Sequence, residues 1–170
     1  MRKRCKNKHI VTALSAATAV VLALVMFIPR AQAETPYDIT GCLSGTYTML
    51  SQSKELTLLS ADFKGIIRSN HENKVFDNCT IHHVRIVKIG AGKWSVHGYS
   101  KLLDPDGDII VQEYSQIGNE ATIKFLAGTG KWKGITGSGT SKILTPNAKP
   151  IMAGTSQGCN RQTGTFELPK

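Results

Sequence analysis

From residue 34 onward, apolar and polar side chains alternate at every second position in short runs. The clearest runs are residues 43–49 and 121–125. Because successive side chains of a strand point to opposite faces, this period predicts strands with one apolar face. A helical period is nearly absent over the same part of the chain, so the pattern predicts an all-β fold.

Turn-forming residues divide the alternating pattern into eight segments. We predict strands over residues 43–49, 55–68, 75–89, 93–103, 109–117, 121–125, 135–144 and 164–168. Leu56 and Leu58 fall out of phase with Leu59, which predicts a bulge or bend near Leu58 and Leu59. Eight antiparallel strands in up-and-down order can close into a barrel, and closure removes the exposed edges that favour aggregation.

The first 33 residues have the pattern of an export signal. Five basic residues between Arg2 and Lys8 precede an uncharged run from Ala13 to Ile28, and Ala31-Gln32-Ala33 follows. We expect a signal peptide over residues 1–33, a single β-barrel domain over residues 34–170, and a secreted or periplasmic location. The alternative is an uncleaved anchor, but the apolar run is shorter than the ~20 residues that span a bilayer. We expect no stable membrane insertion of the mature chain.

The net charge of +9 belongs mostly to this leader. It holds six of the 21 lysines and arginines and none of the 12 acidic residues, which leaves 15 basic residues against 12 in the mature part. The modest group Lys131-Trp132-Lys133 is the only basic cluster downstream. We therefore expect no nucleic-acid partner, since such partners are bound through basic patches.

Three cysteines remain after the leader, and they allow three pairings. In an oxidising compartment one disulfide and one free thiol are expected. We favour Cys42 with Cys159, because these residues flank the first and last strands, which become neighbours if the sheet closes. A bond from Cys79 to either partner is the alternative.

Residues 128–140 read Gly-Thr-Gly-Lys-Trp-Lys-Gly-Ile-Thr-Gly-Ser-Gly-Thr. This stretch resembles the late "GGTG, aromatic, spaced glycines" segment of allene oxide cyclase-like and dirigent-like β-barrels, and of small secreted bacterial β-barrel proteins of unassigned function. The chain departs from that segment at Ala127, where those families usually have the first glycine. The resemblance implies a calycin-like or allene oxide cyclase-like barrel after an N-terminal signal helix. It carries the fold alone, because the residues of cyclase or dirigent chemistry have no match here.

The same glycine-rich stretch raises two further questions. Its spacing is compatible with a phosphate loop, but the residues after it favour a strand over the helix that such a loop requires. Gly137 and Gly139 share a face with Ile135, Ser141 and Ile143. If that face points inward, either a bulky neighbour such as Trp94 or Trp132 fills the space or a cavity remains.

Two groups of polar residues are candidates for metal or proton chemistry. Asp104, Asp106 and Asp108, with Glu113 further on, resemble a calcium loop, but glycine and glutamate stand at the wrong positions and a hairpin tip is the better interpretation. We assign no metal site. His82 and His83 are adjacent and must face opposite sides of a strand. His83 or His97 pointing inward near Glu113 would make a proton-transfer pair.

These observations favour an exported, non-enzymatic barrel that binds a small apolar or hydrophobic ligand in its interior. The candidate lining residues are Tyr47, Phe63, Trp94 and Phe125, because each lies on the more apolar phase of its strand. We assign no cofactor and no catalytic residue, and the oligomeric state is left open. One alternative is a cyclase- or dirigent-like enzyme that shapes a reactive intermediate. Another is a structural or surface-interaction protein with a filled barrel.

Overall fold

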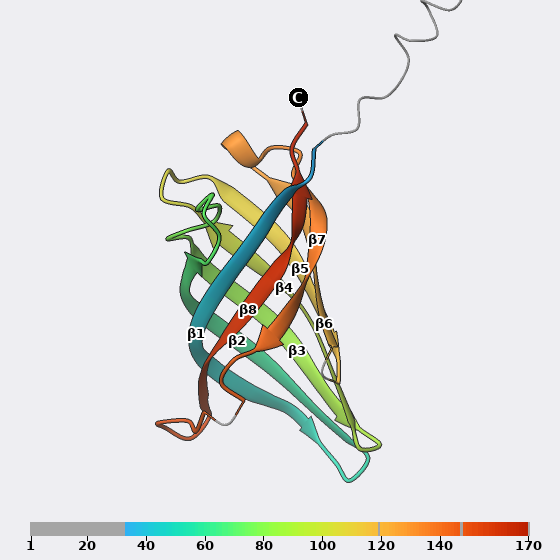
Figure 1. Cartoon of the computed structure of the whole chain (residues 1–170). Helices are drawn as coiled ribbons and strands as arrows, with labels where there is room; N and C mark the ends of the chain where they lie inside the picture. The colour runs from blue at the N-terminus through green and yellow to red at the C-terminus, as the bar shows by residue number, and fades with distance from the viewer. Residues whose placement is uncertain (1–32, 119, 147, 170) are drawn as a thin grey trace, which may run out of the picture. The chain divides into compact units, whose positions relative to one another are not determined.

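The structure is a computed structural model that describes residues 33–118, 120–146 and 148–169. The signal segment predicted over residues 1–33 falls, up to residue 32, outside the described residues. Eight antiparallel strands follow one another around a closed barrel (Figure 1). The predicted all-β, eight-stranded up-and-down barrel is confirmed. No helix in the described ranges is long and apolar enough to cross a membrane.

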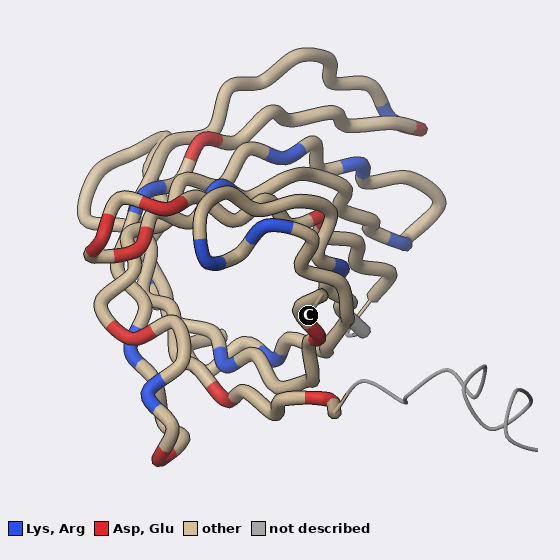
Figure 2. The backbone as a smooth tube through the Cα atoms, turned by 90° about the horizontal axis from the view of Figure 1, so that it is seen from above, with Lys and Arg blue, Asp and Glu red and all other residues tan. Residues whose placement is uncertain are grey.

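Each strand pairs with its neighbours in the chain, and β1 also pairs with β8. The elements are β1 (Thr35–Gln52), β2 (Leu56–Ser69), β3 (Thr80–Gly90), β4 (Lys93–Leu103), β5 (Ile109–Ile117), β6 (Glu120–Gly128), the short 3-10 helix η1 (Gly130–Trp132), β7 (Thr136–Ile143) and β8 (Thr155–Glu167). Viewed from the end, the strands form a ring (Figure 2). The first and last strands, β1 and β8, are longer than the sequence pattern predicts, because twelve residue pairs join them from Thr35–Phe166 to Thr46–Thr155.

The pairing of β1 with β8 also brings the two predicted disulfide partners together. Cys42 lies directly opposite Cys159, and the two form a disulfide with an S–S distance of 2.04 Å. Cys79 is free and buried. The predicted pairing is therefore confirmed, and Cys79 is the remaining thiol.

The third strand begins at Thr80, five residues later than predicted. Lys74, Phe76 and Asn78 have positive φ angles of 52°, 61° and 59°, so residues 70–79 form successive turns instead of a strand. Phe76 is only 3% exposed. The tightly turned backbone places its ring inside the end of the barrel, where burial of an aromatic side chain offsets the strain of a left-handed conformation.

A bulge lies where the sequence suggests, but in the partner strand. Met49 pairs with Leu59 and Ser51 pairs with Leu58, so Leu50 is the extra residue in β1. The phase change of β2 is therefore accommodated by β1. Such bulges sharpen the local twist, which helps a strand of this length to follow the barrel wall.

An aromatic cluster closes one end of the barrel. We define this aromatic plug as Tyr37, Phe76, Phe125, Trp132 and Phe166, whose ring centres lie 5.1 to 6.3 Å apart in the contacting pairs. All five residues are buried. Tyr37 places the plug beside the start of β1 and Phe166 beside the end of β8, and these two strand ends lie at the upper end of the barrel in Figure 1.

Two glycines of the 128–140 stretch make room for this plug. A Cβ at Gly139 would lie 2.2 Å from the Tyr37 hydroxyl, and a Cβ at Gly128 would lie 2.6 Å from the Trp132 Cβ. The space over Gly139 is therefore filled by Tyr37, and a Cβ at Gly137 would meet the backbone of β8. The sequence left a filled interior and an open cavity as alternatives. Both occur, at opposite ends of the barrel.

Candidate functional site

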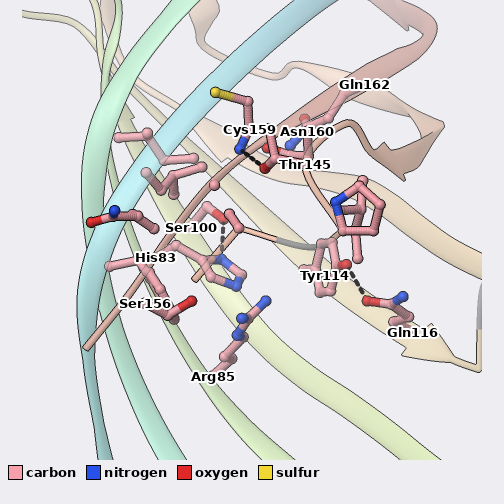
Figure 3. Close-up of a pocket in the computed structure, with 18 of the residues that line it drawn as sticks. His83, Arg85, Ser100, Tyr114, Gln116, Thr145, Ser156, Cys159, Asn160 and Gln162 are labelled. Carbon is pink, nitrogen blue, oxygen red and sulfur yellow. Dashed lines mark hydrogen bonds between the residues drawn. The ribbon is translucent and has the colours of Figure 1, made fainter. Parts of the chain in front are cut away.

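The half of the barrel away from the aromatic plug contains a cavity of about 490 Å³. Side chains from β1 to β5, β7 and β8 line it, together with residues of the β7–β8 segment such as Thr145 and Pro146. Figure 3 shows these side chains converging from several strands. The cavity volume falls within the range of roughly 300–1,000 Å³ that small-molecule pockets occupy.

Three of the four predicted ligand-lining residues meet in this cavity. Tyr47, Phe63 and Trp94 line it, and the Tyr47 and Phe63 rings pack edge to face with centres 5.4 Å apart. Phe125 does not join them, because it belongs to the aromatic plug, 5.5 Å from the Tyr37 ring. Phe125 and the other three share the inward phase of their strands, but they lie at different heights along the barrel.

His83 and Ser100 form a buried hydrogen-bonded pair in the cavity wall. They come from adjacent strands and lie directly opposite each other, with 2.7 Å between His83 Nδ1 and Ser100 Oγ. Burial, followed by the nearby charges of Arg85 and His82, lowers the pKa of His83 to about 4. The imidazole is therefore neutral at pH 7 and can donate or accept a hydrogen bond with a bound molecule.

Arg85 brings a positive charge into the same cavity. Its Nη2 donates to the Tyr47 hydroxyl at 3.0 Å, and its guanidinium carbon lies 4.6 Å from the centre of the Phe63 ring. These contacts hold the flat guanidinium in one orientation. Among the described residues that line the cavity, there is no aspartate or glutamate to balance it.

Tyr114 and Gln116 add a second fixed polar pair on β5. The Tyr114 hydroxyl donates to Gln116 Oε1 at 2.5 Å, and Gln116 Nε2 donates to the carbonyl of Gly118 at 2.9 Å. Burial raises the pKa of Tyr114, which keeps its phenol protonated. The Tyr114 ring also packs edge to face on His83, with centres 5.2 Å apart.

Amide groups lie between the cavity and the aromatic plug. Gln112 is fully buried, and neither atom of its side-chain amide has a hydrogen-bond partner in the protein. Asn160 Oδ1 and Gln162 Oε1, from two residues that line the cavity, are also buried without a partner. Buried polar atoms are nearly always hydrogen-bonded, so this layer offers acceptors to a ligand or to water.

The acidic turn at residues 104–108 is a hairpin tip closed by a lysine. Lys131 Nζ lies 2.7 Å from Asp104 Oδ2 and 2.5 Å from Asp106 Oδ2, in the place a cation would take. The Lys131 amide donates to Asp108 at 3.1 Å. The glycine-rich loop therefore binds a carboxylate of its own chain and leads into a strand, contrary to the phosphate-loop interpretation.

The remaining histidine candidates lie on the outer surface. His82 Nε2 contacts Asp62 at 3.1 Å, and His97 Nε2 lies 3.7 Å from Glu113 Oε1, with all four side chains substantially exposed. Of the three ionisable residues considered for an internal proton-transfer pair, only His83 is inside the cavity. His97 and Glu113 do come together, but outside the barrel.

Arg85 is the main site residue that the sequence analysis missed. It shares the inward phase of β3 with Ile81, His83 and Val87, and this shared phase is a usable signal. The sequence does not distinguish this phase from the other one, because Val84 and Ile86 are also apolar. These two residues face outward and are 47% and 44% exposed. The pattern of β3 alone thus does not show which face is the inner one.

No protein-family model and no curated protein sequence matches the chain. Two solved structures of dirigent proteins share its barrel. The pterocarpan synthase dirigent protein GePTS1 is 9% identical with a TM-score of 0.51, over 81% of this chain and 93% of that one. The pterocarpan synthase dirigent protein PsPTS1 is 10% identical with a TM-score of 0.51, over 82% of this chain and 99% of that one. At this identity the likeness concerns the fold alone, and the chain has a dirigent-like eight-stranded barrel.

Proposed function

We propose that this protein is an exported barrel that binds a small organic molecule in the half of its interior away from the aromatic plug, without transforming it. The observation that carries the proposal is the cavity of about 490 Å³, in which aromatic walls and oriented polar groups face one another. The ligand has an apolar ring body and at least one oxygen-bearing group.

The lining supports both parts of this description. Tyr47, Phe63 and Trp94 supply flat apolar surface, whereas Arg85 and the His83–Ser100 pair supply hydrogen bonds from fixed positions. Ligand sites typically combine an apolar wall with a few such polar groups, which set orientation and specificity. This lining favours an amphipathic ligand, whereas the sequence pattern alone predicted an apolar one.

Export is supported by the disulfide. Cys42–Cys159 persists only where thiols are oxidised, which fits the secreted or periplasmic location expected from the leader. Cell fractionation tests this part: recovery of the full-length, reduced chain from the cytosol would contradict it.

The chain has two tryptophans, which lie in different environments and make a ligand test possible. Trp94 lines the cavity, whereas Trp132 is 8% exposed within the aromatic plug. Titration with a panel of aromatic alcohols, acids and amides is expected to give a saturable change in tryptophan fluorescence. The change disappears in Trp94→Phe, which retains Trp132. If no ligand gives a saturable change, or if Trp94→Phe responds equally, the proposal fails.

A cavity-filling variant gives an independent test. Ser156 lines the cavity, and its neighbour Thr155 pairs with the outward-facing, exposed Thr46 across β1 and β8. Ser156→Phe is expected to block binding, because the new ring occupies the ligand volume. Thr46→Phe, with a ring of the same size on the outside, is expected to bind normally. Equal binding by both variants would place the ligand elsewhere.

A dirigent- or cyclase-like enzyme is the second candidate. The observation that favours it is the presence of His83, Ser100 and Tyr114 as hydrogen-bonding groups within one cavity, in a barrel similar to those of two pterocarpan synthase dirigent proteins. Recovery of each bound compound and its analysis by mass spectrometry separates the two functions. Unchanged compounds support binding alone, and a product lost in His83→Gln supports catalysis.

The third alternative, a structural protein with a solid barrel, has the least support, because only the plugged half of the described interior is filled.

A further inference from the structure

Arg85 is a half-buried positive charge in the cavity wall whose full hydrogen-bonding capacity is not used. Its Nη2 donates to Tyr47, and its Nε is buried with no partner in the protein. The stacking on Phe63 covers one face of the guanidinium but gives no acceptor. A charge inside a cavity normally has a counter-charge, and none of the described lining residues is acidic, so we expect the counter-charge of Arg85 to come from outside the chain.

The planar guanidinium of Arg85 is a group that recognises carboxylates. A guanidinium binds a carboxylate side-on through Nε and one Nη, which form two parallel hydrogen bonds. Arg161 on the outer surface of this protein makes that arrangement, donating from Nε and Nη2 to the two oxygens of Asp38. In Arg85 the Nε is covered by protein atoms, so a carboxylate in the cavity is expected to meet the terminal nitrogens, of which Nη2 also donates to the Tyr47 hydroxyl.

Tyr47 completes the anion site. Its hydroxyl oxygen accepts a hydrogen bond from Arg85, so its own proton remains available to a bound oxygen. Trp94 and the edge of Tyr47 then provide the apolar surface for the rest of the ligand. The neighbouring imidazole of His83 is neutral at pH 7 and adds no competing charge.

We propose that the ligand of this cavity is a small aromatic carboxylate, whose carboxylate group binds Arg85 and Tyr47 and whose ring packs against Trp94. This inference rests on the proposed binding function and specifies its ligand class. Inorganic anions satisfy the charge but leave the aromatic wall bare, so they bind far more weakly than an aromatic acid.

The test compares acids with neutral molecules of nearly the same shape on the unmodified full-length mature protein. Benzoate and cinnamate are titrated beside benzamide and cinnamamide, with acetate and inorganic phosphate as anions that lack a ring. Calorimetry and Trp94 fluorescence report the affinities. Each acid is expected to bind at least ten times more tightly than its amide, and the preference is expected to shrink as salt rises.

Charge-matched variants assign the preference to one residue. Arg85→Gln is expected to bind acid and amide equally. Lys88→Gln removes one positive charge from the exposed, outward side of the same strand and is expected to keep the preference. Melting curves of both variants establish that they are folded.

The outcomes separate this inference from the function on which it rests. Equal affinity of acid and amide for the unmodified protein overturns the carboxylate assignment but leaves the binding function intact. Retention of the preference in Arg85→Gln also overturns it, as does binding of acetate or phosphate as tight as that of cinnamate. Failure of every aromatic compound to bind overturns both proposals together.

Discussion

Asp104 is a buried carboxylate whose charge the fold stabilises, and removing that charge gives a measurable loss. Its side chain is 1% exposed and lies between the hairpin tip and the aromatic plug. Oδ1 accepts from the amides of Asp106 and Asp108, and Oδ2 accepts from Trp132 Nε1 at 2.9 Å and from Lys131. Asp104→Asn removes the charge and presents an NH₂ group to at least one of these donors.

The size of the loss follows from the pKa. Burial alone would raise the pKa of Asp104, but the hydrogen bonds from Lys131, Trp132 and the Asp108 amide outweigh it and lower the pKa to about 2. The usual aspartate pKa in an unfolded chain is about 3.9, and each unit of difference corresponds to about 1.4 kcal/mol. The charged form of Asp104 therefore adds about 2–3 kcal/mol to the free energy of unfolding.

The pH dependence has a definite sign. Because the pKa is lower in the folded state than in the unfolded chain, the contribution is complete above about pH 4 to 5 and is lost as the pH falls toward 2. Urea unfolding of the unmodified protein and of Asp104→Asn, followed by circular dichroism, is expected to give a difference of about 2–3 kcal/mol at pH 7 that shrinks toward zero near pH 2.

Asp106 provides the matched control. It contacts the same Lys131, but its side chain is 73% exposed. Asp106→Asn is expected to change the free energy of unfolding by less than about 1 kcal/mol, as is usual for an exposed ion pair. The reasoning is refuted if both variants lose the same amount at pH 7, or if the loss in Asp104→Asn does not depend on pH.

Four further predictions concern the closure of the barrel, its plug, its free thiol and its internal charge. The double variant Cys42→Ser, Cys159→Ser opens a covalent loop of sequence separation 117, and thermal melting is expected to show a loss of up to about 5 kcal/mol; an unchanged melting temperature would contradict this. Phe76→Ala empties the centre of the plug and is expected to lower the free energy of unfolding by about 3–5 kcal/mol, and a loss below about 1 kcal/mol would mean that the loop folds without its ring. Cys79 is 0% exposed and burial raises its thiol pKa to about 11. A maleimide is therefore expected to label Cys79 in urea and not in the native protein, and rapid labelling of the native protein would contradict the buried position of this thiol. Arg85→Met removes a charge that no carboxylate in the cavity lining balances, and it is expected to stabilise the ligand-free protein by about 1 kcal/mol. A lower melting temperature would show that the contacts of Arg85 with Tyr47 and Phe63 outweigh the cost of desolvating its charge.

Local patterns predicted the ends of a strand well wherever turn residues lie directly before and after it. Strands β4 and β5 have the predicted bounds, because the turn at residues 104–108 and the glycines on either side leave little freedom in where pairing stops. The start of the strand predicted from Val75 was wrong. The apolar pair Val75-Phe76 has the composition of a strand, but Phe76 is buried at the barrel end by rings from β1, β6 and β8.

The candidate site was predictable only in part, because phase gives the face of a residue but not its height in the barrel. Tyr47, Phe63, Trp94 and Phe125 all have the inward phase, yet only the first three reach the cavity. Height is set by the stagger between strands, which pairs residues far apart in the sequence. Arg85 was missed for a related reason: both phases of β3 are largely apolar, and only the closed sheet shows which one is inside.

The amino-acid sequence alone determined the class of fold and the number and order of the strands, because a two-residue period and local turn residues act within a few positions of the chain. Only the tertiary structure decided that one end of the barrel is filled and the other is open, and that a guanidinium lies in the open part without a carboxylate beside it. The reason is physical: cavity and charge balance depend on which side chains meet across the barrel, and that is set by closure of β1 on β8 and not by any local pattern.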